Sequence, residues 1–501
     1  MRGIPSMISD IRRKVFAEVA RMAYSGDYSQ MDDIPYKIVP GTNPKHRESV
    51  FLERAIAGER LRLAMGLSLQ NVQTRTLISE GMDQAAIAQQ YYEPPLINII
   101  PYACHACPTK RYVVTELCQS CLASSCQQVC PKGAIKFNNR KSQINEDLCI
   151  KCGKCARACS YHAIVCIERP CQVACGMDAI GSDEYGKAVI DYDRCVSCGQ
   201  CLVSCPFGAI VDKSQIYQVI RSILEGNEVI AIVAPSFAGQ FGADVTPAKF
   251  VAGMKQLGFA DVMEVAIGAD ICAMEEAVDF MKNVPRKQWF MATSCCPSWR
   301  MMVRRLFPEE EGNISMTYTP MVYTARLAKK EHPGCKVVFV GPCAAKKLEA
   351  MQEDIRSDVD FVLTYEELRG IFEAKEVNFL TIKPDKNDLA QSSAFARGFA
   401  AAGGVAAAVE HHIHKRWPAY EVQTLRADGL RECRKLLMQA KAGKLSDNLV
   451  EGMACPGGCI AGAGTLLPTE IAQKRLQMHI NEAPFQNIDE SKYKYIEEEL
   501  K

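Results

Sequence analysis

Apolar and polar positions follow two different patterns along this chain of 501 residues. Apolar residues recur at helical spacing from Ile8 to Met22 and from Ser49 to Leu67, with Arg and Glu on the opposite faces. Continuous apolar runs, typical of strands buried on both faces, occur at 229–233, 289–292 and 336–340. These patterns predict a helical N-terminal region over residues 1–100 and an α/β domain in the second half of the chain.

Each of the three apolar runs is followed by a turn that carries reactive or cavity-forming residues. These turns contain Pro235-Ser236, Cys295-Cys296 and Pro342-Cys343. Ligand sites at the carboxyl ends of strands are expected in open α/β sheets. We therefore expect residues 215–465 to form an α/β catalytic domain of two lobes around a buried metal cluster, followed by a charged helical tail over 466–501.

The composition narrows the compartment and the kinds of partner. The chain has 59 Lys and Arg against 58 Asp and Glu, which gives no general case for nucleic acid or an anionic membrane as a partner. It contains no apolar run of about 18 residues and no apolar signal core at its start, so we expect a cytoplasmic protein without a membrane span. Its 25 cysteines, grouped in C-x-x-C runs, then indicate metal ligation rather than disulfides.

Seventeen of these cysteines lie between Cys104 and Cys205, in two similar halves. An Ala-Ile pair follows the last cysteine of each run, at 134–135, 163–164, 179–180 and 209–210, which marks an internal repeat. Both halves resemble the bacterial two-cluster ferredoxin. The resemblance implies α+β ferredoxin-like domains over residues 101–165 and 166–214.

In that fold, three closely spaced cysteines bind one 4Fe–4S cluster and the fourth crosses to the other cluster. The resemblance implies three complete ligand sets: Cys118, Cys121, Cys126 and Cys159; Cys149, Cys152, Cys155 and Cys130; and Cys195, Cys198, Cys201 and Cys175. A fourth set combines Cys205, Cys171 and Cys166 with Cys107, or with Cys104 in place of Cys107. Four accessory clusters are favoured, while three clusters, or His105 as a ligand, stay open. Zinc ribbons lack this interlocked spacing and are disfavoured.

Three separated segments, at 293–299, 341–349 and 451–459, supply five further cysteines. Four thiolates can close a cubane cluster, and a fifth thiol can act as an acid–base group. These segments resemble the active-site loops of FeFe-hydrogenases, and the resemblance covers about 229–465. It implies an H-cluster, a 4Fe–4S cubane joined to a diiron unit with CO, cyanide and a bridging dithiolate, which maturases install. The implied cubane ligands are Cys296, Cys343, Cys455 and Cys459, the last of which bridges to the diiron unit.

The resemblance also assigns residues around the diiron unit. Lys346 matches the lysine that holds an iron cyanide ligand, and an ammonium in a closed pocket needs such an anion. Pro235 and Ser236 match the turn beside the dithiolate. Met453 and Phe399 match residues that cover the diiron unit, although each would be an ordinary core residue if considered alone.

A proton path is implied as well. Cys295 matches the thiol that exchanges protons with the bridging amine, because a thiol pKa can be tuned near the working pH. From Cys295 the family's path runs through Glu276, Ser315 and Asp279. Glu276 and Asp279 are three residues apart on a helix predicted over 270–281 and share one face. Asp279 is one methylene shorter than the glutamate of well-known members, which predicts a bridging water beside it.

The favoured function is reversible oxidation of H2 to two protons and two electrons, with a ferredoxin or flavodoxin as the electron partner. Gly341 and Met321 depart from the best-studied members and resemble a less characterised branch called group B. Two alternatives stay open: an H2 sensor with little turnover, and an iron–sulfur assembly scaffold of the hydrogenase-like type. The tail over 466–501 either resembles the small subunit of some relatives or is a solvated terminus.

Overall fold

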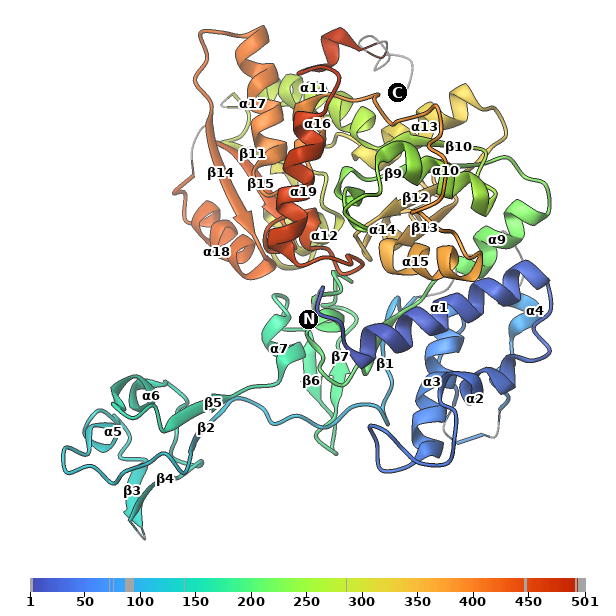
Figure 1. Cartoon of the computed structure of the whole chain (residues 1–501). Coiled ribbons are helices and arrows are strands. Elements are labelled where there is room, and N and C mark those ends of the chain that lie inside the picture. Colours follow the sequence, from blue (N-terminus) through green and yellow to red (C-terminus); the bar gives the residue numbers. More distant parts are fainter. Residues whose placement is uncertain are drawn as a thin grey trace.

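The computed structural model describes residues 3–491 and 493, except residues 72, 75, 86–93, 139, 285 and 446–447. Two parallel sheets form the second half of the chain (Figure 1). In the described ranges, no helix is both long enough and apolar enough to cross a membrane. The predicted tail is described only as far as residue 493, and residues 492 and 494–501 lie outside the described residues.

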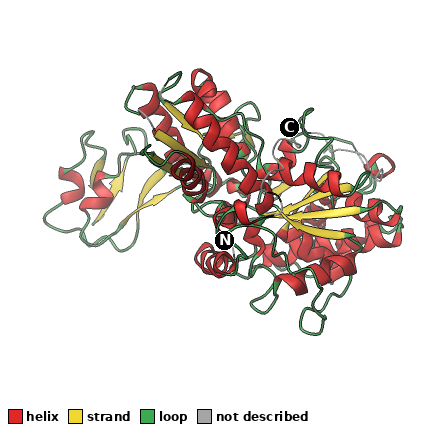
Figure 2. Cartoon of the chain, turned by 90° about the horizontal axis from the view of Figure 1, so that it is seen from above, coloured by secondary structure: helices red, strands yellow, loops and turns green. Residues whose placement is uncertain are grey.

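The first lobe is built on a four-stranded parallel sheet with the order β10-β9-β12-β13. Its strands are β9 (Val229–Val233), β10 (Asp261–Glu264), β12 (Lys336–Gly341) and β13 (Phe361–Thr364). Its helices are α9 (Ile216–Leu224), α10 (Pro247–Leu257), α11 (Ala266–Asn283), α13 (Pro320–Glu331), α14 (Lys346–Glu349) and α15 (Tyr365–Ala374). Figure 2 shows helices on both sides of this sheet.

Burial on both faces explains the continuous apolar run of β9. Val229, Ala231 and Val233 pack into one hydrophobic core, while Ile230 and Ile232 pack into a second core on the other face. A strand whose two faces are both covered has no polar side to present. The predicted strand at 229–233 therefore coincides with β9, and the predicted strand at 336–340 lies within β12.

The second lobe contains a three-stranded parallel sheet with the order β11-β15-β14. Its strands are β11 (Phe290–Ala292), β14 (Gln423–Asp428) and β15 (Asn448–Met453). Its helices are α12 (Pro297–Leu306), α16 (Ala394–Gly398), α17 (Gly404–Arg416), α18 (Leu430–Lys441) and α19 (Thr469–Asn481). Trp289, predicted to start a strand, precedes β11 and is 73% exposed.

Helix α19, which belongs to the second lobe, also contacts the first lobe. His479 of α19 is buried, and its Nε2 lies 3.2 Å from Oε1 of Glu264, at the end of β10. Arg397 Nη1 donates a hydrogen bond to the carbonyl oxygen of His479 at 2.7 Å. α19, which lies within the predicted tail, is therefore anchored to both lobes.

The N-terminal region is helical, with α1 (Met7–Ser25), α2 (Ile34–Ile38), α3 (Val50–Ala64) and the short α4 (Met82–Ala85). Ser6 caps α1 in a capping box with Ser9. Val15, Phe16 and Val19 belong to the same core as one face of the four-stranded sheet, because α1 packs on α15 and α9. The N-terminal region is therefore an integral layer of the first lobe.

The ferredoxin-like unit nearer the lobes is assembled from segments that are distant in sequence. It contains β1 (Ile97–Ile99), α7 (Pro170–Ala174), β6 (Ile180–Ser182), β7 (Ala188–Ile190), α8 (Gln200–Ser204) and β8 (Ile210–Asp212). β1 pairs with β8 in antiparallel register. The sequence predicted that 97–99 belong to the helical region and that 101–107 belong to the first ferredoxin-like domain. In the structure, both segments belong to the ferredoxin-like unit nearer the lobes.

The other ferredoxin-like unit, the outer unit, is inserted between Cys107 and Pro170. It contains β2 (Arg111–Val114), α5 (Ser125–Gln128), β3 (Ile135–Asn138), β4 (Lys141–Ile144), α6 (Lys154–Ala158) and β5 (Ile164–Ile167). It has its own small hydrophobic core, and its six elements pack extensively only against one another. In Figure 1 the outer unit stands apart from the lobes, joined to them through β2 and β5.

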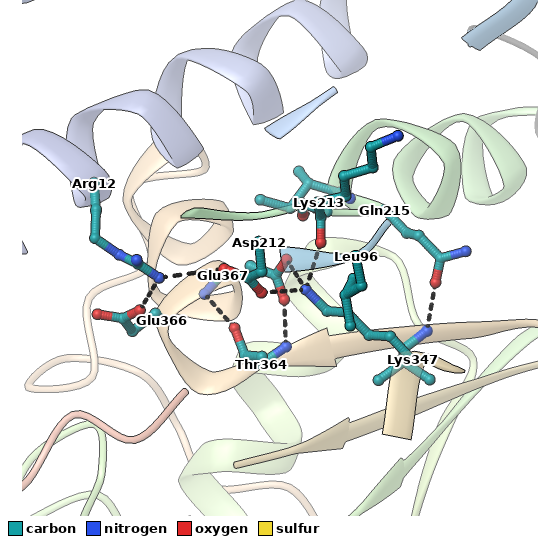
Figure 3. Close-up of polar contacts among 12 residues, drawn as sticks. Arg12, Leu96, Asp212, Lys213, Gln215, Lys347, Thr364, Glu366 and Glu367 are labelled. Atoms are coloured by element: carbon teal, nitrogen blue, oxygen red, sulfur yellow. Dashed lines mark hydrogen bonds and ion pairs between the residues drawn. The ribbon is translucent and has the colours of Figure 1, made fainter. Parts of the chain in front are cut away.

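A buried network of charges joins α1, the ferredoxin-like unit nearer the lobes and the first lobe (Figure 3). Lys347 Nζ lies 2.8 Å from both Asp212 Oδ2 and Glu367 Oε1. Arg12 of α1 lies 2.5 Å from Glu366 Oε2 and 3.5 Å from Asp212 Oδ1. Lys347, which follows Lys346, belongs to α14. This network therefore also holds α14 beside the carboxyl ends of the strands.

Candidate metal centre

A cavity of about 90 Å³ lies where the carboxyl ends of the two sheets face each other. β9, β12, β11 and β15 each end there, and the loops that follow them form its wall. The cavity is lined by the four cysteines predicted as cubane ligands: Cys296, Cys343, Cys455 and Cys459. Parallel strands bring these loops together because their carboxyl ends lie at the same edge of each sheet.

The chemistry of this donor set fits an iron–sulfur cluster. Burial raises the pKa of Cys343 to about 12, and the neighbouring Cys455 and Cys296 add to the effect. Burial likewise raises the pKa of Cys459, which lies close to Cys343, Cys296 and Cys455. Four soft, mutually close sulfur ligands in a dry cavity suit iron, which lowers thiol pKa values when it binds.

Local backbone features position two of these cysteines. Cys296 is the N-cap of α12, with Pro297 as the first helical residue, and the backbone N–H of Ala454 donates to its Sγ at 3.5 Å. Cys459 follows Gly457 and Gly458, which both have φ of +91°. A Cβ atom at Gly458 would lie 2.5 Å from the backbone nitrogen of Ala402, so the close approach of these loops requires glycine there.

Lys346 lines the same cavity and is buried. Its Nζ lies 2.6 Å from Glu349 Oε2 and donates a hydrogen bond to Thr319 Oγ1 at 3.0 Å. Burial alone would lower the pKa of Lys346, but Glu349 outweighs this and raises it. Lys346 is therefore a fixed ammonium at the cavity wall, able to meet an anionic ligand.

The remaining predicted pocket residues, Pro235, Ser236, Met453 and Phe399, also line the cavity. Ser236 is held by Tyr365, whose hydroxyl lies 2.7 Å from Ser236 Oγ. The Tyr365 hydroxyl also donates to the carbonyl oxygen of Ala234 at 3.0 Å. Tyr365 thus fixes the turn after β9, although no local sequence signal identified it.

Cys295 lines the cavity beside Cys296 and close to Glu276. Burial, with further contributions from Glu276 and Cys296, raises the pKa of the Cys295 thiol well above its usual value. Burial also raises the pKa of Glu276 to about 7. A protonated thiol beside a carboxyl group that titrates near neutrality is a suitable pair for proton exchange.

From Glu276 a series of hydrogen bonds leads outward. Ser294 Oγ donates to Glu276 Oε1 at 3.1 Å and also lies 2.8 Å from the carbonyl oxygen of Thr317. Ser315 Oγ lies 2.9 Å from Thr317 Oγ1 and 3.2 Å from Asp279 Oδ2. Ser315 contacts Asp279 directly, so the prediction of a bridging water beside the shorter side chain is wrong at this point. Asp279 lines a separate cavity of about 630 Å³, which also contains the exposed Met316.

The outer unit gathers its cysteines in two groups. A small cavity of about 20 Å³ is lined by four cysteines of one predicted set: Cys130, Cys149, Cys152 and Cys155. Of the other set, Cys126 lies 3.6 Å from Ser142 Oγ, Cys118 also bonds Ser142, and Cys126 and Cys159 belong to the small core of this unit.

The repeated Ala-Ile pairs have a structural role in these groups. The backbone N–H groups of Ala134, Ala163 and Ala179 donate to the sulfurs of the cysteines four residues earlier, at 3.3, 3.4 and 3.3 Å. The preceding residues, Gly133, His162 and Asp178, have φ between +50° and +59°. In these three of the four repeats, the chain therefore turns so that an amide N–H points at a cysteine sulfur.

A third group, the inner group, lies next to the cavity between the lobes. It contains Cys175, Cys195, Cys198 and Cys201, whose thiols are close enough to raise the pKa of Cys201 further after burial has raised it. Cys198 also lines the cavity of the metal centre. Gln200 Nε2 donates a hydrogen bond to Cys455 Sγ at 3.2 Å, which connects this group to the centre.

The fourth group differs from the predicted set. Burial raises the pKa of Cys171 to about 11, and Cys205, Cys104 and Cys107 add to that effect. Cys104 and Cys107 are therefore both members, rather than alternatives. Cys166 is not brought to this group; it is exposed on β5, opposite Tyr112 of β2. The pairing of β1 with β8 brings 104–107 beside Cys205, and no local pattern reveals that pairing.

Three contributors to the site escaped the sequence analysis besides Tyr365. Ser294 and Thr317 connect Glu276 to Ser315, and Glu349 pairs with Lys346. The pairing of Glu349 with Lys346 could have been predicted from the sequence, because residues three apart share a helix face. Ser294 and Thr317 come from different segments, so only the folded chain brings them together.

Comparison with known proteins gives matches along most of the chain. Residues 227–463 match the family model described as "Iron only hydrogenase large subunit, C-terminal domain", and residues 141–164 and 188–211 each match a "4Fe-4S binding domain". Iron hydrogenase 1 of Clostridium pasteurianum is 26% identical over 479 residues, covering 83% of this chain and 80% of that protein. The cytosolic Fe-S cluster assembly factor narfl of Danio rerio is 25% identical, covering 55% of this chain and 84% of that protein.

Solved structures of FeFe-hydrogenases are also similar. A variant of HydA1 from Chlamydomonas reinhardtii matches with 20% identity and a TM-score of 0.47, covering 56% of this chain and 94% of that chain. The family match spans the loops that carry the four cavity cysteines, and the two 4Fe–4S matches fall in the two ferredoxin-like units. The family match and the curated relative, together with the four cysteines of the cavity, support an FeFe-hydrogenase-like protein.

Proposed function

We propose that this protein is an FeFe-hydrogenase that interconverts H2 with two protons and two electrons. The observation that carries the proposal is the position of Cys295, whose thiol lies between Glu276 and the cavity lined by four cysteines and Lys346. When bound, an H-cluster would supply the redox chemistry on hydrogen. Cys296, Cys343, Cys455 and Cys459 would hold its cubane, and Lys346 would meet an anionic ligand of its diiron unit.

In this proposal the chain moves protons through its own side chains. Cys295 exchanges a proton with Glu276, whose carboxyl group titrates near pH 7. Ser294 keeps Glu276 oriented, and Ser315 and Asp279 continue the path to the larger cavity. Ser294 bonds the backbone carbonyl oxygen of Thr317, whereas Ser315 bonds the side-chain hydroxyl of Thr317. A carbonyl oxygen carries no proton, so proton transfer between Ser294 and Ser315 requires rotation of a hydroxyl or an intervening water.

Electrons would travel through four accessory 4Fe–4S clusters held by the four cysteine groups. The outer unit is suited to meet the electron partner, because it carries nine basic and four acidic residues between 108 and 168, a net charge of +5. The rest of the chain is therefore net negative, since the whole chain has +1. Six exposed cations of the outer unit form no ion pair with described residues: Lys132, Lys136, Arg140, Lys151, Lys154 and Arg157. This charge favours an acidic carrier such as a ferredoxin or flavodoxin.

A second candidate function is iron–sulfur cluster assembly, which the name of the Danio rerio relative states for that protein. That relative matches 55% of this chain, whereas the Clostridium pasteurianum hydrogenase matches 83%. A scaffold needs the cubane cysteines but has no use for a relay from Cys295 through Glu276. The relay therefore favours the enzyme.

The test uses full-length protein, loaded anaerobically with a synthetic diiron precursor. Infrared bands of bound CO and cyanide report the diiron unit, and hydrogen evolution from a reduced viologen dye reports turnover. We expect bands in both the unchanged protein and Cys295→Ala, with turnover lost in the variant. Cys335→Ala, a buried cysteine that contacts Ala328 away from the cavity, is the matched control. Bands without turnover would favour a sensor, and absence of bands with intact cubanes would favour the scaffold.

A further inference from the structure

Two arginines lie buried beside the group of Cys104, Cys107, Cys171 and Cys205. Arg60 of α3 is 5% exposed, and Arg169, which precedes α7, is 2% exposed. Within the described ranges neither arginine forms an ion pair with a carboxylate. A buried charge without a counter-charge is costly, so a negative group is expected close to both guanidinium groups.

Arg60 approaches this group from the N-terminal region. Its Nη2 donates a hydrogen bond to the carbonyl oxygen of Gly208 at 2.8 Å, and its buried Nε has no hydrogen-bond partner. Burial lowers the pKa of Arg60 to about 10, and the nearby Arg12 and Arg47 lower it further, while Cys205 acts in the opposite direction. Among the described residues, the neighbour that favours its charged form is Cys205, a cysteine of the group.

Among the described residues, Arg169 donates its hydrogen bonds to neutral acceptors. Its Nη2 donates to the carbonyl oxygens of Cys107 and Gly186 at 2.8 and 2.7 Å. Its Nη1 donates to the carbonyl oxygen of Gly181 and to Ser182 Oγ, at 2.8 and 2.9 Å. These bonds satisfy its N–H groups but do not balance its charge, and that charge partly offsets the burial that raises the pKa of Cys107 and Cys171.

Arg47 adds a third cation at the edge of the same group. It is half-buried, and its Nη2 donates to the carbonyl oxygens of Ala103 and Phe207, at 3.2 and 3.0 Å. Ala103 precedes Cys104, and Phe207 follows Cys205 by two residues. The N-terminal region therefore contributes both charge and hydrogen bonds to the loops that carry these two cysteines.

We propose that Arg60 and Arg169 are built-in counter-ions of the iron–sulfur cluster held by Cys104, Cys107, Cys171 and Cys205, and that they raise its reduction potential. The proposal depends on the accessory clusters of the proposed function, but not on hydrogen chemistry. Reduction adds one electron from a neighbouring cluster or carrier and forms or breaks no bond. Because the reduced cluster is more negative, a buried cation favours it over the oxidised form.

The inner group provides the contrast within the same chain. Arg305 lies near Cys195 but is exposed, so solvent screens its charge. The cluster flanked by Arg60 and Arg169 should therefore hold its electron at a higher potential than the cluster of the inner group. It would act as an electron store between the outer unit and the metal centre, and this assigns a role to the N-terminal helical region.

The test is a redox titration followed by electron paramagnetic resonance, on full-length protein with reconstituted accessory clusters and no diiron unit. Cys171→Ser assigns the signal of this cluster. In Arg60→Met we expect the ratio of reduced to oxidised cluster, at the unchanged protein's midpoint, to fall about tenfold, equal to 59 mV for one electron. Arg60→Lys should keep the midpoint, and Arg305→Met should leave this signal unchanged.

An unchanged midpoint in Arg60→Met, with full iron content, would overturn the proposal and leave the arginine a purely structural residue. If Arg60→Met fails to bind its full iron, Arg47→Gln at the half-buried position carries the test. It should lower the midpoint by a smaller amount in the same direction, and the absence of any shift would contradict the proposal. Because no hydrogen is measured, a failed hydrogenase assay and a failed titration are distinguishable outcomes.

Discussion

Ser294 donates two hydrogen bonds to one carboxylate oxygen of Glu276. The backbone N–H of Ser294 lies 2.9 Å, and its Oγ 3.1 Å, from Glu276 Oε1. The other oxygen, Oε2, is buried and has no hydrogen-bond partner in the part of the chain that the structure describes. Ser294 therefore fixes the orientation of the carboxyl group and leaves Oε2 as the oxygen that can exchange a proton.

Glu276→Gln should remove this exchange while keeping the shape of the side chain. We expect dye-driven hydrogen evolution to fall by about 10²- to 10⁴-fold, the usual contribution of a positioned proton-transfer group. The infrared bands of CO and cyanide should stay unchanged, because the metal ligands are untouched. Glu432→Gln on the exposed face of α18 is the control. Equal rates in the two variants would contradict the proposed relay.

The same substitution should change how stability depends on pH. Burial raises the pKa of Glu276 to about 7 from its usual value of 4.5, so the folded protein binds this proton more tightly than the unfolded chain. Stability is therefore lost as the pH rises through this window, by about 3 kcal/mol in total. Glu276→Gln should match the unchanged protein near pH 4.5 and exceed it at pH 8. Thermal unfolding midpoints, measured against pH on cluster-loaded protein, check this expectation.

Asp279 should matter as a proton acceptor rather than as a structural group. It accepts from Ser315 Oγ at 3.2 Å and from Asn283 Nδ2 at 2.7 Å. Asp279→Asn preserves the size but cannot ionise, so we expect turnover to fall by about tenfold or more. Asp279→Glu should retain most of the rate, and its solvent isotope effect should resemble that of the unchanged protein. Full activity in Asp279→Asn would place the exit of the path elsewhere.

Two adjacent lysines should have different phenotypes. Lys347→Met leaves Glu367 buried without its cation and Asp212 with only the more distant Arg12, so we expect a loss of about 3–5 kcal/mol of stability. Lys346→Met should also lose stability, because it leaves the buried Glu349 without its cation, but it should in addition abolish the CO and cyanide bands, because Lys346 faces the cavity. Lys435→Met, in the exposed pair with Glu432, is the control and should change stability by less than about 0.5 kcal/mol. Unfolding midpoints and infrared spectra separate the three.

The charge of the outer unit should control reaction with an acidic carrier. We expect Lys132→Gln, Lys151→Gln and Lys154→Gln, combined in one protein, to reduce the ferredoxin-dependent rate severalfold at low salt. The rate with a viologen dye should not change, and the salt dependence with ferredoxin should weaken. An unchanged ferredoxin rate would show that electrons enter the protein at another surface.

Several parts of this site follow from local sequence. The apolar run of β9 reflects burial on both faces, and the C-x-x-C runs reflect loops that must place sulfurs a few ångströms apart. Helical spacing also gave the right neighbours where both residues lie on one helix, as with Glu276 and Asp279. In each of these cases the interacting residues are close in sequence, so a pattern of a few residues contains the relevant geometry.

Only the tertiary structure decided the assignments that depend on contacts between segments distant in sequence. The membership of Cys104 and Cys107 in one group, and the exclusion of Cys166, follow from the pairing of β1 with β8. The burial of Arg60 beside Cys205 likewise joins residues that are about 145 positions apart, as their numbers show. Sequence by itself determined the donor types, their local spacing and the strands that present them. The assignment of donors to groups and the charges around them needed the fold, because long-range strand pairing and burial leave no periodic signal in the chain.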